Sequence, residues 1–78
     1  MRTDFTTKSG AQYTVFIRDD GIYASRVGPN SDDQYPDGEV ERFDVVSNIV
    51  PGSTVTFYRK DGTVRVTTTV VEVLNGED

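Results

Sequence analysis

The chain contains no cysteine and no histidine, and these two absences exclude several kinds of active site. Without thiols it forms no disulfide, no thiolate metal site and no cysteine nucleophile. Without imidazole it lacks the commonest general base and the commonest metal ligand. We therefore expect a protein that is not an enzyme and that binds no metal or other cofactor. The lack of cysteine also suits a reducing compartment.

Good helix formers and long apolar runs are scarce as well. The chain has two alanines and one leucine, whereas valine and threonine together supply 22 of its 78 residues. β-Branched side chains favour strands over helices. No apolar run approaches the roughly 18 residues of a membrane span, and the first residues lack the apolar segment of a signal peptide. We expect a cytoplasmic protein that forms a single all-β domain over residues 1–78.

Positive charge is also in short supply, because 13 Asp and Glu face 8 Lys and Arg and give a net charge of −5. Nucleic acids and anionic membranes attract basic surfaces, so direct binding to either is disfavoured. A chain of this length buries only about 60–65% of its unfolded surface, which leaves a small core. We therefore expect self-association or a protein partner.

The most informative pattern that is present is Asp61-Gly62, which separates alternating runs over residues 53–60 and 63–73. An Asp-Gly pair supplies the positive backbone angles of a two-residue hairpin turn. Such a turn pairs Tyr58 with Arg65 on one face and Phe57 with Val66 on the other. The predicted core then contains eight residues: Phe5, Tyr13, Val15, Ile17, Val55, Phe57, Val64 and Val66.

Glycine-ended turns also separate the first three expected strands, which cover residues 2–7, 11–18 and 22–27. A three-residue loop in the first hairpin places Phe5 opposite Tyr13, which keeps the apolar alternation on one face. The same loop length in the second hairpin places Ile17 opposite Tyr23. These registers give the sheet one apolar face.

The middle of the chain is an acidic loop at residues 28–38, followed by a short strand at 39–43. Residues 44–50 predict either a 3₁₀ turn or a bent strand. The segment from Asp33 to Asp44 half-matches a calcium loop, with Gly at position 6. Its position 12 is Asp instead of the bidentate Glu, and no helices flank it, so we interpret it as a solvated acidic loop.

The apolar alternation changes parity within Thr67-Thr68-Thr69, which predicts a bulge or corner at that point. The following segment is apolar at Val70, Val71, Val73 and Leu74, and a strand apolar on both faces needs cover on both. The candidate interface residues come from this strand, the last hairpin and the acidic loop: Tyr58, Arg65, Val71, Val73, Tyr35 and Asp37.

Two short motifs carry a family resemblance. They are Thr7-Lys8-Ser9-Gly10 with Tyr13, and the segment from Asp61 to Glu72 with its Asp-Gly-Thr-Val-Arg start. In these motifs the chain resembles small uncharacterised β-rich proteins of actinobacterial phages and their hosts. The resemblance covers about a third of the chain and implies an intracellular phage or prophage product. It brings no activity and no functional residues.

These patterns predict an all-β fold, with five or six antiparallel strands in a small barrel or rolled sheet of the SH3-like or OB-like kind. The expected function is a non-catalytic protein-interaction module, such as a phage host-interaction factor or a small virion protein. The alternative is a protein that acts as an oligomer and binds a small anionic, nucleotide-like ligand with its few arginines.

Overall fold

The computed structural model describes residues 1–28 and 38–77, with side chains through residue 74, and these residues form eight strands and no helix. The strands are β1 (Arg2–Thr7), β2 (Gln12–Arg18), β3 (Gly21–Val27), β4 (Val40–Phe43), β5 (Val45–Val46), β6 (Thr56–Tyr58), β7 (Val64–Val66) and β8 (Val70–Glu77). All pairings are antiparallel. The all-β prediction is confirmed, although eight short strands replace the five or six expected.

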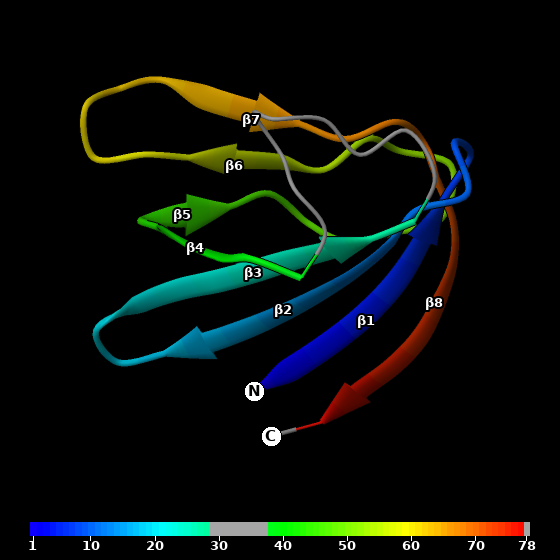
Figure 1. Cartoon of the computed structure of the whole chain (residues 1–78), viewed down its shortest axis with the longest axis horizontal. Coiled ribbons are helices and arrows are strands. Elements are labelled where there is room, and N and C mark those ends of the chain that lie inside the picture. The colour runs from blue at the N-terminus through cyan, green and yellow to red at the C-terminus, as the bar shows by residue number, and fades with distance from the viewer. Residues whose placement is uncertain (29–37, 78) are drawn as a thin grey trace.

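The strands form two sheets, which Figure 1 shows one above the other. The large sheet has the order β4-β3-β2-β1-β8, and the small sheet has the order β5-β6-β7. The chain changes sheet at Asp44, between β4 and β5, and again at Thr67–Thr69, between β7 and β8. The predicted corner at the three threonines is therefore confirmed. Of the two alternatives predicted for residues 44–50, the strand is formed only at Val45–Val46, and no 3₁₀ turn is formed. The described strands do not close into a barrel.

Four aromatic rings join the two sheets. Phe5 stacks on Tyr13 with ring centres 5.1 Å apart, and Phe57 lies 6.4 Å from Tyr13 and 4.9 Å from Phe43. This chain of rings links β1 and β2 of the large sheet to β6 of the small one. The predicted core residues in these rings are buried, as are Val15 and Val55, and Ile17 packs against them.

The register of the first hairpin is confirmed, but that of the second is wrong. Phe5 pairs with Tyr13 as predicted, whereas Ile17 lies opposite Ile22 and not Tyr23. The second turn contains only Asp19 and Asp20 between the paired residues. The backbone carbonyl of Asp20 accepts a hydrogen bond from the Arg42 Nε of β4 at 2.9 Å. This contact from a distant strand holds the short turn.

The hairpin between β6 and β7 has a longer turn than predicted. The N–H of Arg59 donates to the carbonyl of Thr63 over 2.9 Å, and the N–H of Gly62 donates to the carbonyl of Arg59 over 3.1 Å. Lys60, Asp61 and Gly62 therefore form a three-residue turn. Gly62 has a φ of 89°, so the positive backbone angle is confirmed although the turn length is wrong.

Hydrogen bonding to the neighbouring strand explains why the two-residue turn is not formed. Successive residues of a strand bond alternately to its two neighbours. The Tyr58 carbonyl accepts the Asp44 N–H at 2.8 Å on the β5 side, whereas the Val55 carbonyl accepts the Thr67 N–H at 2.9 Å on the β7 side. A two-residue turn requires Tyr58 to bond toward β7, which conflicts with its bond to the β5 side.

The extra turn residue shifts the register by one and therefore reverses the two faces of β7. Phe57 pairs with Arg65, and Tyr58 pairs with Val64. The prediction that Val64 and Val66 lie in the core is wrong, because they are 45% and 55% exposed, while Arg65 is 7% exposed. The predicted Tyr58–Arg65 pair is wrong for the same reason.

Candidate interaction surfaces

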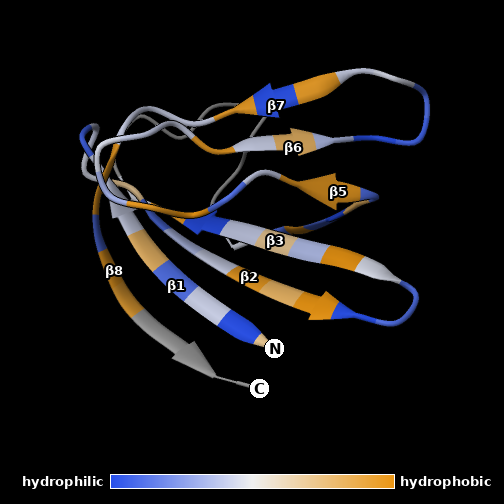
Figure 2. Cartoon of the chain, turned by 180° about the vertical axis from the view of Figure 1, so that it is seen from behind, coloured by the Kyte–Doolittle hydropathy of each residue, from blue (hydrophilic) through white to orange (hydrophobic). Residues whose placement is uncertain are grey.

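The outer face of the small sheet carries four apolar or aromatic side chains in register. Val45 of β5 lies opposite Tyr58 of β6, which lies opposite Val64 of β7, and Val66 lies opposite Thr56. Directly opposite residues of antiparallel strands share a face. We call this surface the valine face: Val45, Tyr58, Val64 and Val66. Its members are 43–55% exposed, and Figure 2 shows β5 and both ends of β7 as hydrophobic.

Arg65 occupies the opposite, core side of β7, where a charge cluster holds it. Its Nη1 lies 3.8 Å from Oε1 of Glu41 on β4, and its Cζ lies 5.7 Å from the ring centre of Tyr13. Arg59 binds the same carboxylate, with Nε 2.5 Å from Oε2 and Nη2 3.3 Å from Oε1. A buried guanidinium requires such partners. Glu41 therefore helps to keep Arg65 inside and the valines outside.

The pattern of β7 is the reverse of the one expected for a strand with one face in water. Two valines face solvent, and the arginine between them is buried. Valine is among the residues most often buried, and arginine is among those least often buried. A local pattern that conflicts with the fold is a feature of functional surfaces. The valine face is therefore the leading candidate for a docking surface.

The predicted interface residues Val71 and Val73 lie on β8, which is an edge strand of the large sheet. The pairing of β8 with β1 skips Val71 and Leu74, which form two bulges and are 59% and 46% exposed. Val73 lies opposite Phe5 and is 37% exposed. Bulges disturb a sheet edge and discourage pairing with a further strand. The edge of β8 is therefore less suited to docking than the valine face.

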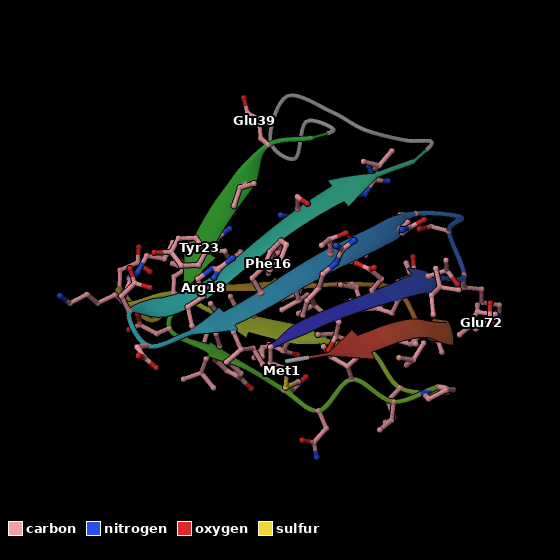
Figure 3. All side chains as sticks on the ribbon, turned by 90° about the horizontal axis from the view of Figure 1, so that it is seen from below. Met1, Phe16, Arg18, Tyr23, Glu39 and Glu72 are labelled. Atoms are coloured by element: carbon pink, nitrogen blue, oxygen red, sulfur yellow. The ribbon has the colours of Figure 1, made fainter. Side chains whose placement is uncertain are left out.

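A row of arginine and aromatic side chains crosses the outer face of the large sheet, and the sequence predictions did not identify it. Arg2 lies opposite Phe16, Phe16 opposite Tyr23, and Tyr23 opposite Arg42. Figure 3 shows Phe16, Tyr23 and the neighbouring Arg18 together on this face. The signal in the sequence was the shared face of Arg2, Phe16 and Arg18 in the first hairpin. The incorrect second register placed Tyr23 opposite Ile17, on the other face.

The charges of this row are largely balanced. Arg2 forms an ion pair with Asp4 at 3.1 Å, and Arg42 forms one with Asp44 at 3.5 Å. The guanidinium of Arg18 lies 5.0 Å from the ring centre of Phe16 and has no carboxylate partner among the described residues. Among the described residues, the outer face of the large sheet therefore offers the Arg18 guanidinium beside aromatic rings, and not a broad basic surface.

A hollow of about 340 Å³ opens between the two sheets. Its lining is mostly apolar, with a few hydroxyl and amide groups: Met1, Thr3, Ile17, Val46, Ser47, Asn48, Ile49 and Val73. Among the described residues, no group of three acidic side chains is placed to hold a metal ion. The part of the chain that the structure describes has no helix long and apolar enough to cross a membrane.

The remaining predicted interface residues, Tyr35 and Asp37, lie outside the described residues, as does most of the acidic loop. No protein-family model matches the chain, and neither a curated protein nor a solved structure matches it. The resemblance to phage proteins therefore stays a prediction. The arguments for function come from the geometry of the chain itself.

Proposed function

We propose that the protein is a non-catalytic protein-interaction module that docks through the valine face. The observation that carries this proposal is the reversed pattern of β7, which exposes Val64 and Val66 and buries Arg65. The small sheet is thereby apolar on its outer face, while Val46, Val55 and Phe57 pack on its inner side. A sheet with apolar side chains on both faces is typical of one that is covered on both sides.

A second copy of the chain is the partner that this surface fits. The four side chains of the valine face carry no charge, whereas the whole chain has a net charge of −5 and copies of it repel one another. Two uncharged faces can pack sheet on sheet, as in a β-sandwich. The exposed Tyr58 ring would supply the aromatic anchor that is common at the centre of interfaces.

The finer fold assignment and the biological setting belong to this proposal. The chain passes from one sheet to the other at Asp44 and at Thr67–Thr69, which resembles a partly opened roll and is in keeping with an SH3-like or OB-like relationship. With the phage resemblance, the module would be a host-interaction factor or a small virion component that acts inside the host cell.

Sedimentation velocity on a concentration series tests the proposal. We expect the chain to self-associate at about 50 μM, which lies above the micromolar affinity of a modest interface. Val64→Thr with Val66→Thr keeps β-branched shapes but makes the face polar, and should give a monomer. Val71→Thr is a matched control, because Val71 is equally exposed on another strand. A monomeric parent chain, or association lost only in the Val71→Thr variant, would contradict the proposal.

The arginine–aromatic row supports a second candidate function, the binding of a small anionic, nucleotide-like ligand by an oligomer. The Arg18 guanidinium, next to Phe16, provides a cation beside an aromatic surface, and arginine suits phosphate recognition. A thermal-shift series with ATP and inorganic phosphate tests it, with Arg18→Gln as the comparison. A midpoint that neither compound raises would remove this candidate.

A further inference from the structure

We infer that the β6–β7 hairpin exchanges between two registers, and that docking on the valine face selects the observed one. In the second register β7 moves by one residue, so that Phe57 pairs with Val66 and Tyr58 pairs with Arg65. The selection step rests on the proposed function, whereas the exchange rests on the hairpin alone. Three features of the hairpin support two registers.

The first feature is the alternation of β7. A shift by one residue turns Val64 and Val66 toward the core and brings Arg65 out to water, because neighbouring side chains of a strand point to opposite faces. This arrangement buries apolar surface that is exposed in the observed register. The observed register instead keeps Arg65 beside Glu41 and Tyr13. Each register therefore has a favourable contribution that the other lacks.

The second feature is the turn, which has room to change its length. In the shifted register Arg59 faces Val64, and the loop contains four residues, Lys60–Thr63, in place of three. Arg59 still bonds toward β7, so the bonding of β6 to its two neighbours is preserved. Hairpin loops of three and of four residues are both common. At the tip, a Cβ added to Gly62 would have no atom within 4 Å.

The third feature is the threonine run that follows β7. The N–H of Thr67 donates to the Val55 carbonyl over 2.9 Å, and its Oγ1 accepts the Val55 N–H over 3.1 Å. A one-residue shift brings Thr68 to this position, and an identical side chain can form both bonds again. The longer turn needs one more residue in the hairpin. The bent segment at Thr68, between β7 and β8, can supply this residue. The strand end therefore has the same hydrogen-bonding groups in both registers.

The exchange regulates the proposed docking site. In the observed register the outer face presents Tyr58 beside Val64, and in the shifted register it would present Tyr58 beside Arg65. A second copy that packs on the valine face stabilises only the first arrangement. A ligand shifts an equilibrium by its difference in affinity for the two states. Association should therefore deplete the shifted register.

Paired cysteines trap each register, because the parent chain has no cysteine. Thr56→Cys with Val66→Cys puts two cysteines at positions that are directly opposite in the observed register. Thr56→Cys with Thr67→Cys puts them at positions that are directly opposite only in the shifted register. Thr56→Cys with Thr68→Cys is the control, since these positions are directly opposite in neither register. A disulfide requires Cβ atoms about 3.5–4.5 Å apart, so only opposite pairs close readily.

With dilute monomer and a glutathione redox buffer, we expect both register pairs to close about tenfold faster than the control, because their Cβ atoms meet. An excess of the unmodified chain should slow closure of the Thr67→Cys pair, because this variant keeps all four residues of the valine face. A Thr67→Cys pair that closes no faster than the control would overturn the inference. An unchanged rate of closure of the Thr67→Cys pair in that excess would overturn the selection step.

The unmodified chain provides a second measurement if a cysteine variant does not fold. Nuclear Overhauser contacts between the Hα atoms of Thr56 and Val66 mark the observed register, and those between Thr56 and Thr67 mark the shifted one. Exchange with no self-association would refute the proposed function and leave the two registers standing. Self-association of a chain that shows only the Thr56–Val66 contact in the dilute monomer would refute the register exchange alone.

Discussion

Phe57 and Tyr58 are neighbours in β6 that face opposite ways, and truncating each to alanine separates stability from association. Phe57 is fully buried and contacts the rings of Phe43 and Tyr13 across the two sheets. Tyr58 is 43% exposed and belongs to the valine face. We expect Phe57→Ala to destabilise the protein strongly and Tyr58→Ala to leave it stable but unable to associate.

The magnitudes follow from burial. Removing a buried Phe side chain costs about 3–5 kcal/mol, which includes the cavity left behind. At about 0.05–0.15 kcal/mol per residue, a chain of this length has a total stability of about 4–12 kcal/mol. Phe57→Ala therefore removes between a quarter and all of it. Tyr58 has no such cavity to leave, and the loss of its cross-strand contacts costs about 1 kcal/mol or less.

Urea denaturation followed by tyrosine fluorescence and circular dichroism measures the stability of both variants. These samples must be more dilute than the associating concentration, because a bound partner raises apparent stability. Sedimentation velocity at about 50 μM then measures association. Equal losses of stability in the two variants would refute the assignment of the faces. Undiminished association of the Tyr58→Ala variant would refute the role of the valine face.

Three further results are expected. Gly28→Ala should destabilise more than Gly62→Ala in urea, because a Cβ at Gly28 (φ 151°) would lie 2.7 Å from a backbone atom and one at Gly62 would meet nothing; the reverse order would contradict this. Hydrogen bonds from the Thr63 hydroxyl and N–H lower the pKa of Asp61, so its stabilising effect is present above the unfolded-state pKa of about 3.9 and is lost as pH falls through the lower folded-state value. Asp61→Asn should therefore flatten the fall in melting temperature in acid, and an unchanged slope would refute the contribution. Glu41→Gln should lower the free energy of unfolding by about 1–3 kcal/mol, less than for a fully buried pair because Glu41 is partly exposed; a change near zero would show that the charge cluster does not hold β7.

The sequence was sufficient to predict the all-β class, the first hairpin and the corner at Thr67–Thr69. These features depend on the two-residue period of strands and on local turn chemistry, which are properties of short segments. The absence of a long helix at residues 44–50 was predictable, because a run of β-branched residues makes a poor helix, whereas the sequence did not decide between a 3₁₀ turn and a strand. Three of the four core rings, Phe5, Tyr13 and Phe57, were identified, because each lies on the apolar face of its own alternating strand.

The two incorrect registers share one physical cause. Turn length was predicted from the turn residues, but contacts with distant strands determine it. Arg42 of β4 holds the turn at Asp20, and the bond from Asp44 fixes the direction in which Tyr58 bonds. No local pattern contains these contacts.

The valine face was missed because an alternating strand has two possible orientations. The segment Val64–Val66 fits either face, and the usual preference for buried valine gave the wrong one. One partner of the buried Arg65 is Glu41, more than 20 positions earlier in the chain, which lies 3.8 Å from its guanidinium. The anomaly was visible only after the strands had been placed together.

The most direct test of the docking surface is a series of ¹H–¹⁵N spectra between about 20 and 500 μM, a range that spans a micromolar to submillimolar dissociation constant. We expect concentration-dependent shifts at Val45, Tyr58, Val64 and Val66, with Val71 on β8 unchanged. Shifts confined to β8, or spectra that do not change over this range, would contradict the proposal that the valine face joins two copies of the chain.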